Sequence, residues 1–320
     1  MKEVPVLALP LGVLIGLVMP LQTSANSRLR LSVGSPFLAS FISFLVGTLT
    51  LLVATLLVDG GLPDLGLAAG QPGWLWAGGF LGVVVLTGNI FLFPRLGSVQ
   101  TVVLPITGQV LMGLLIDHFG WFHSPQAPLS ATRVAGAVLL VVGVLGAIGL
   151  LDTLVRRRTV APVLDGGRGE GAGLWLWRAA GVVFGMCGAT QTAVNGRLGV
   201  VIDSAVAAAL VSFTVGVTTL LLIVLATRTP WRLRRLDGRP NPWWMWIGGF
   251  LGAAFVFGNA FLAPIIGTGL TVMVILLGLM GGSLIIDHFG LLGARRKPTT
   301  ALQALGLLLM VAGVALIRLV

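Results

Sequence analysis

The sequence predicts an all-α membrane protein in which ten transmembrane helices form two five-helix repeats of inverted topology. The prediction depends on apolar composition, on the number of long apolar runs and on an internal duplication. Hydrophobic residues make up 56% of the chain, charged residues make up 9%, and the mean hydropathy is +1.03. A chain with so little polar surface cannot cover a soluble globule and is typical of a polytopic membrane protein.

The number of spans follows from the apolar runs. About 20 apolar residues are needed to cross the roughly 30 Å of hydrocarbon in a bilayer. Ten runs of about this length occur, near residues 4–22, 36–58, 74–93, 98–117, 133–152, 175–194, 204–226, 243–263, 268–286 and 300–319. We therefore expect ten helices, five in each half of the chain.

The duplication is visible without introducing a gap. Residues 76–120 align with residues 246–290 at an offset of 170, and 21 of the 45 positions are identical by direct count. Earlier in the chain the offset is 169, and it relates residues 22–29 to residues 191–198. A period this long indicates two halves of one molecule and not a solenoid array.

The odd number of spans predicts the symmetry. A half that crosses the membrane five times ends on the opposite face, so the second half must be inserted upside down relative to the first. We expect the first repeat at 1–152, a flexible basic linker at 153–173 and the second repeat at 174–320. An Arg- and Gly-rich linker of this kind suits a tether between the two repeats.

The distribution of Lys and Arg predicts the orientation. Sixteen of the twenty basic residues fall in the loops after the odd-numbered helices, and four fall on the other face. Basic residues concentrate on the cytoplasmic side of a membrane protein. Both termini are therefore predicted outside the cytoplasm. The same explanation accounts for the net charge of +10, so we do not expect a nucleic-acid partner.

Three repeated motifs resemble those of a known family. A Gln-x-x-x-Asn occurs near the end of each first run, a Gly-Asn-x-Phe-Leu-x-Pro in each third run and an Asp-His-Phe-Gly at the end of each fourth run. With two fused five-helix halves, the chain is similar to the drug/metabolite transporter superfamily, and within it to the fused YdcZ-like inner-membrane exporters. The resemblance implies a multi-pass protein of the inner membrane that acts as a secondary exporter. Ten-helix members of the superfamily are expected to keep both termini in the cytoplasm, so the orientation predicted above is a departure.

Polar residues within apolar runs are the candidates for a transport site, because each is costly in hydrocarbon unless it faces another polar group, a cavity or a substrate. Asn89 and Asn259 occupy equivalent positions, and each is followed five residues later by a proline that tends to kink a helix. We predict that both contact substrate. The alternative is that each asparagine only bridges two helices through a hydrogen bond.

A second amide set lies near the ends of the first runs. Gln22 and Asn26 are four residues apart, as are Gln191 and Asn195, so each pair shares one helix face. We predict that they line a gate or vestibule and bind substrate. The alternative is that each asparagine serves as a helix C-cap.

The repeated Asp-His pairs are the candidates for proton coupling. Asp117 with His118, and Asp287 with His288, each combine a carboxylate with an imidazole that titrates near neutrality. The alternative, which we favour, is structural, because both pairs lie at predicted helix ends. No acid is predicted in the middle of a helix, and the first run lacks the glutamate that a proton-coupled small multidrug exporter would carry.

Trp76 and Trp246 are included as candidate substrate contacts, although tryptophan at a helix end is more often an interfacial anchor. A repeated Gly-Gly-Phe-Leu-Gly at 78–82 and 248–252 predicts close packing of helices.

The predicted function is secondary active export of a small neutral, zwitterionic or amphipathic metabolite by alternating access. A channel or a lipid flippase on the same inverted repeat is the alternative. An enzyme is not expected, because the chain has three His, one Cys and no Tyr and lacks recognised catalytic motifs. We expect no cofactor and no metal. The expected partners are a small-molecule substrate, membrane lipids and, as a candidate coupling ion, protons.

Overall fold

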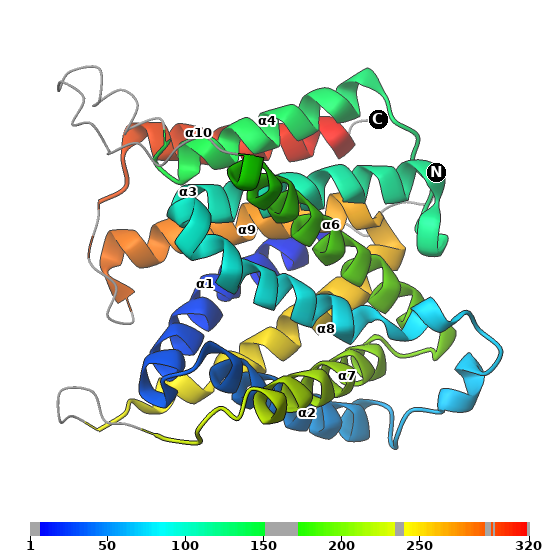
Figure 1. Ribbon diagram of the computed structural model, residues 1–320. Helices are drawn as coiled ribbons and strands as arrows, with labels where there is room; N and C mark the ends of the chain where they lie inside the picture. The colour runs from blue at the N-terminus through cyan, green and yellow to red at the C-terminus, as the bar shows by residue number, and fades with distance from the viewer. Residues whose placement is uncertain (1–6, 151–171, 234–239, 292–295, 297, 319–320) are drawn as a thin grey trace.

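The computed structural model describes residues 7–150, 172–233, 240–291, 296 and 298–318, and within them every regular element is helical (Figure 1). The predicted linker at 153–173 lies outside the described residues except for its last two, which belong to the helix that follows. The α-helices of the first half are α1 (Ala8–Val33), α2 (Pro36–Val58), α3 (Gly78–Phe119) and α4 (Ala131–Ala147). Those of the second half are α6 (Ala172–Val201), α7 (Ala205–Ala226), α8 (Gly248–Ile266), α9 (Thr268–Phe289) and α10 (Ala301–Arg318).

Short 3-10 helices connect some of these elements: η1 (Leu65–Ala68), η2 (Gly73–Trp76), η3 (Trp121–His123) and η5 (Trp243–Trp246). Serine side chains begin three of the α-helices. Ser35, Ser130 and Ser204 each accept a hydrogen bond from a backbone N–H in the first turn of the helix that follows. Such N-caps satisfy donors that have no partner within the helix.

The described helices confirm a multi-pass membrane protein. Six are long and apolar enough to cross a bilayer, and they correspond to α1, α2, the second part of α3, α7, α8 with the turn before it, and α9. The first part of α3, α4 and α10 are shorter apolar helices.

The prediction of separate helices at 74–93 and 98–117 is wrong in detail, because the helix continues through residues 94–97 as α3. A straight helix of its 42 residues would be about 63 Å long, twice the hydrocarbon thickness. Figure 1 shows that α3 instead bends sharply near its middle and turns back. In the second half Gly267, with φ 86° and ψ 156°, does separate α8 from α9.

The predicted end of the first helix near residue 22 is also wrong. α1 continues to Val33 and ends at Gly34 in a left-handed conformation, with φ 72°. Asn26 and the equivalent Asn195 therefore lie inside α1 and α6 and are not C-caps. The helix tolerates these amides because glycines on a neighbouring helix leave room for them, as described below.

The packing is exchanged between the halves, because helices of each half pack against helices of the other half. α1 packs against α8 and α9 of the second half, and α6 packs in the equivalent way against both parts of α3. α2 pairs with α7, and α4 pairs with α10 along one edge of the molecule (Figure 1). Phe44 of α2 and Phe213 of α7 are equivalent residues, and their rings stack with centroids 4.7 Å apart. This pattern is that of a pseudo-twofold relation between the halves.

Candidate functional site

The amide pair of α1 lies against two glycines of α8. A Cβ on Gly248 would collide with the Asn26 side chain, and a Cβ on Gly252 would collide with that of Gln22. The glycines therefore provide the space that the two amides fill, and α1 continues as a helix past them. The amide oxygens of Gln22 and Asn26 are buried and have no hydrogen-bond partner among the described residues.

The second half repeats the arrangement on the opposite pair of helices. The side chains of Gln191 and Asn195 on α6 fill the space above Gly82 and Gly78 of α3. Asn195 also donates a hydrogen bond of 3.2 Å from Nδ2 to Oγ of Ser212 on α7. The repeated glycine motif and the repeated amide motif are thus the two sides of one contact, which occurs once in each direction between the halves.

The two candidate substrate asparagines have different surroundings. Asn259 is buried on α8, where its Oδ1 lies 3.1 Å from the hydroxyl of Thr192 on α6 and its Nδ2 donates to the carbonyl of Phe255. This is the bridging contact between helices that the sequence left open as an alternative. Asn89 on α3 is half-buried, and its Oδ1 is buried without a partner.

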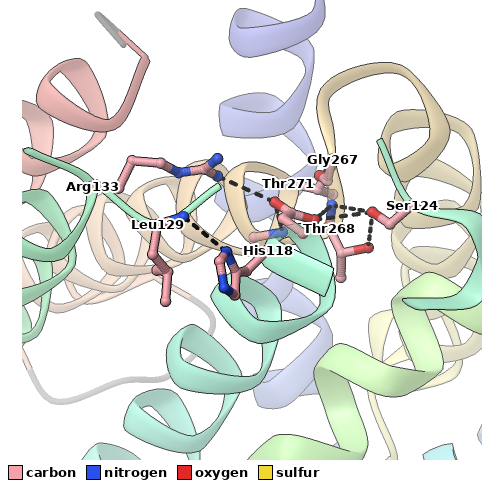
Figure 2. Close-up of polar contacts among 9 residues, drawn as sticks. His118, Ser124, Leu129, Arg133, Gly267, Thr268 and Thr271 are labelled. Atoms are coloured by element: carbon pink, nitrogen blue, oxygen red, sulfur yellow. Dashed lines mark hydrogen bonds and ion pairs between the residues drawn. The ribbon is translucent and has the colours of Figure 1, made fainter. Parts of the chain in front are cut away.

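Asp117 lies at the centre of a buried polar cluster with Ser124, Arg133 and Thr268, and these three neighbours are labelled in Figure 2. Its carboxylate accepts hydrogen bonds from the backbone N–H groups of Thr268 at 2.8 Å and Gly269 at 2.9 Å, which are the first two residues of α9. The Ser124 hydroxyl donates to the carboxylate at 3.0 Å, and Nη2 of Arg133 on α4 lies 3.4 Å from it. Asp117 is 1% exposed and caps the N-terminus of α9, where a negative charge stabilises the helix dipole.

Three contacts of this cluster were missed by the sequence reasoning. Ser124, Arg133 and Thr268 bind Asp117 here, but Ala294 and Gln303 occupy the positions equivalent to the first two. A search for repeated residues could not find side chains that occur in one half alone. The signal available was Arg133 itself, one of only four basic residues on the face predicted to be outside.

The histidines have matching positions in the two halves. Nδ1 of His118 accepts a hydrogen bond from the backbone N–H of Leu129, and Nδ1 of His288 accepts one from Thr299, both at 3.1 Å. These two hydrogen bonds hold the chain that leads into α4 and α10. Asp287, the equivalent of Asp117, is exposed at the last turn of α9.

The candidate tryptophans lie where two helices begin. Trp76 and Trp246 end the 3-10 helices η2 and η5, directly before α3 and α8. Trp76 is partly buried against a cluster that includes Leu198 and Ile202, and Trp246 is 39% exposed. Neither contacts the asparagines through any recorded hydrogen bond or ring interaction, and their positions suit interfacial anchors.

Two apolar grooves open on the sides of the molecule. One, of about 460 Å³, lies between α2, α7 and α8 and is lined by Phe250, Phe257 and Phe261, with Asp59 and Ser204 at its edge. The other, of about 560 Å³, lies between α1, α9 and α10. Neither is lined by the paired amides. Within the described part of the chain, no cluster of His, Cys, Asp and Glu side chains could hold a metal ion.

Comparison with known proteins bears on these features in three ways. A search of curated proteins finds no match. Nineteen chains of solved structures match, among them one titled "Crystal structure of protein", which has a TM-score of 0.64 and 16% sequence identity over 98% of this chain and 96% of that one. That likeness shows the fold alone.

The model of one family, described as "Putative inner membrane exporter, YdcZ", matches residues 7–146 and 176–316. The chain belongs to the YdcZ family. The match falls twice on the chain, once on each half, which agrees with the duplication and with the exchanged contacts. Family membership makes this YdcZ protein a multi-pass inner-membrane protein and supports a transporter in place of an enzyme.

Proposed function

We propose that this YdcZ-family protein is a secondary transporter that exports a small neutral, zwitterionic or amphipathic metabolite by alternating access. The observation that carries the proposal is the exchanged packing of the two halves, in which equivalent polar residues lie on equivalent helices. Five spans in each half would give the halves opposite orientations, and inverted repeats of this kind alternate by rocking one half against the other.

The proposed substrate contacts are Asn89 and Asn259, supported by the matched amides Gln22, Asn26, Gln191 and Asn195. An amide offers both a donor and an acceptor and carries no charge, so it suits a neutral or zwitterionic solute. Within the described residues, every acidic side chain lies in a loop or in the last turn of a helix, away from these amides. This distribution supports a solute without a strong net positive charge.

Ion coupling is a separate part of the proposal. Asp117, His118, Asp287 and His288 remain the candidates for proton coupling, but three of them are engaged in hydrogen bonds that hold helix ends. Asp287 is exposed at the end of α9.

The first experiment is a screen of small metabolites for those that raise the melting temperature of the purified protein, since a ligand stabilises the folded state by mass action. The stabilising solute is then loaded into proteoliposomes, and its flux is measured for the native protein and for Asn89→Ala combined with Asn259→Ala. We expect saturable, countertransport-stimulated flux in the native protein and its loss in the double variant. Asn241→Ala, which changes an asparagine outside the helices, is the control and should retain flux.

Either of two results would overturn the proposal. Normal flux in the double variant would remove the two asparagines from the mechanism. Conductance near diffusion rates, with no countertransport, would show a channel in place of a carrier.

A further inference from the structure

The two halves share a sequence pattern but are packed differently. Within the second half, α8 contacts both α6 and α7. The equivalent contacts in the first half would join α3 to α1 and to α2, and among the described residues these pairs make at most marginal contact. The second half is therefore closed where the first half is open.

A single hydrogen bond lies at the centre of this difference. The hydroxyl of Thr192 on α6 lies 3.1 Å from Oδ1 of Asn259 on α8, and both side chains are buried. The hydroxyl has one proton, and its other acceptor, the Gly188 carbonyl, is farther away at 3.3 Å. The bond thus joins α6 to α8 through two buried side chains.

The same two residue types occupy the equivalent positions of the first half, but they are apart. Thr23 on α1 is exposed, and its hydroxyl donates to the carbonyl of Met19 in its own helix. Asn89 on α3 has a buried Oδ1 with no partner. A buried acceptor left unpaired is costly, so a second arrangement in which Asn89 is paired would recover that cost.

The residues beside the bond favour the arrangement observed. A Cβ on Gly196 would lie 3.1 Å from atoms of Ala263 and Pro264, so α6 and α8 approach closely because two of these residues are small. The position equivalent to Gly196 holds Ser27 in the first half. Closing α1 on α3 therefore has to accommodate a larger side chain there, and this bias predicts that the protein rests with α6 and α8 closed.

We propose that Thr192 with Asn259, and Thr23 with Asn89, are two gate latches that close in turn on opposite sides of the membrane. The inference rests on the proposed function and adds the threonines as positioning residues of the transport cycle. With the orientation predicted from the basic residues, α6 and α8 end at the outer face, so the first half is open towards the cytoplasm. An exporter loads its substrate from that side.

Disulfide cross-linking of the full chain tests the latches without a substrate. In a Cys187→Ala background, one variant carries Thr192→Cys and Asn259→Cys, and another carries Thr23→Cys and Asn89→Cys. Each is reconstituted in proteoliposomes and oxidised with copper(II)–phenanthroline. We expect both pairs to cross-link, the first quickly and the second at least tenfold more slowly, because the second state is rarer.

Control variants make a negative result informative. Asn195→Cys with Ser212→Cys joins neighbouring helices of one half and should cross-link quickly, which shows that the oxidant reaches this depth. If that pair cross-links and the Thr23 pair does not, the first half never closes and the proposal fails.

A second measurement uses only single substitutions, so it tests the proposal even if a double variant folds poorly. Thr23→Cys, at an exposed site, should react with a water-soluble maleimide, whereas the buried Thr192→Cys should react at least tenfold more slowly. Equal rates would contradict the asymmetric state. If both latches form but no solute is transported, the exporter function fails while the gate stands, so the two failures are distinguishable.

Discussion

Replacing Asp117 with alanine tests whether one carboxylate holds the two halves together. Asp117 belongs to the first half, and the α9 N-terminus that it caps belongs to the second. The substitution would remove the partner of two backbone N–H groups and of the buried Arg133, whose Nε already has no partner. The change therefore leaves several buried groups without a partner at once.

The magnitude follows from the contacts. Losing a helix N-cap costs about 0.5–2 kcal/mol. Breaking a buried ion pair by removing one partner costs about 3–5 kcal/mol, and the 3.4 Å separation here favours the lower end. Because the two costs share the same carboxylate, they overlap, and we expect a total of about 3–4 kcal/mol. Asp117→Asn keeps one acceptor oxygen and should lose less.

The matched control is Asp287→Ala, which removes the equivalent residue of the second half. Asp287 is exposed, so its loss should change the free energy of unfolding by no more than about 0.5 kcal/mol. Thermal unfolding of the purified protein in detergent, followed by tryptophan fluorescence, measures both variants. An unfolding entropy of about 2.1 cal/mol/K per residue gives about 1.5 °C per kcal/mol for a chain of 320 residues, so Asp117→Ala should melt at least about 4 °C lower than Asp287→Ala. Equal melting temperatures would refute the reasoning.

Two further predictions concern the contacts between helices. Gly78→Ala places a methyl group against the Asn195 side chain and should destabilise the protein by about 1–3 kcal/mol through overpacking. Adding Asn195→Ala should restore part of that loss. Gly73→Ala is the control in the same melting assay and should be near neutral, because a Cβ there has no neighbour within 4 Å. Thr192→Val removes the hydrogen bond to α8 and should lower the free energy of unfolding by about 1 kcal/mol, whereas Thr23→Val removes only a bond within α1 and should lower it less. Equal decreases in chemical unfolding would argue against a resting state in which only α6 and α8 are closed.

Much of the fold was predictable because the sequence contains two copies of the same five-helix unit. The repeated motifs marked the two halves, and the Gly-Gly-Phe-Leu-Gly motif was correctly read as a packing signal. What could not be read was its partner, since nothing in one helix shows that its glycines receive Gln and Asn from a helix more than a hundred residues away. The ends of the first helix in each half were misplaced because polar residues after an apolar run resemble the end of a helix. Only the structure shows that glycines of a neighbouring helix make room for these side chains.

The candidate site was predicted less completely, because a repeat describes what the halves share and not what distinguishes them. Asp117 and Asp287 lie in identical motifs, yet one is buried and the other exposed. The difference comes from Ser124 and Arg133, which have no equivalent in the second half. Asn89 and Asn259 likewise differ in whether the helix opposite has approached, and the repeated motif around each asparagine does not show this difference.

The exchange of amides and glycines also says something about how such a chain can arise. Each half carries both a Gln-x-x-x-Asn face and a glycine surface, and each face packs against the glycine surface of the other half. Two copies of one half, inserted in opposite directions, could make both joints at once. Fusion of the copies then leaves each free to diverge. The cluster of Asp117 with Ser124 and Arg133 is such a divergence, because it forms in one half and has no equivalent in the other.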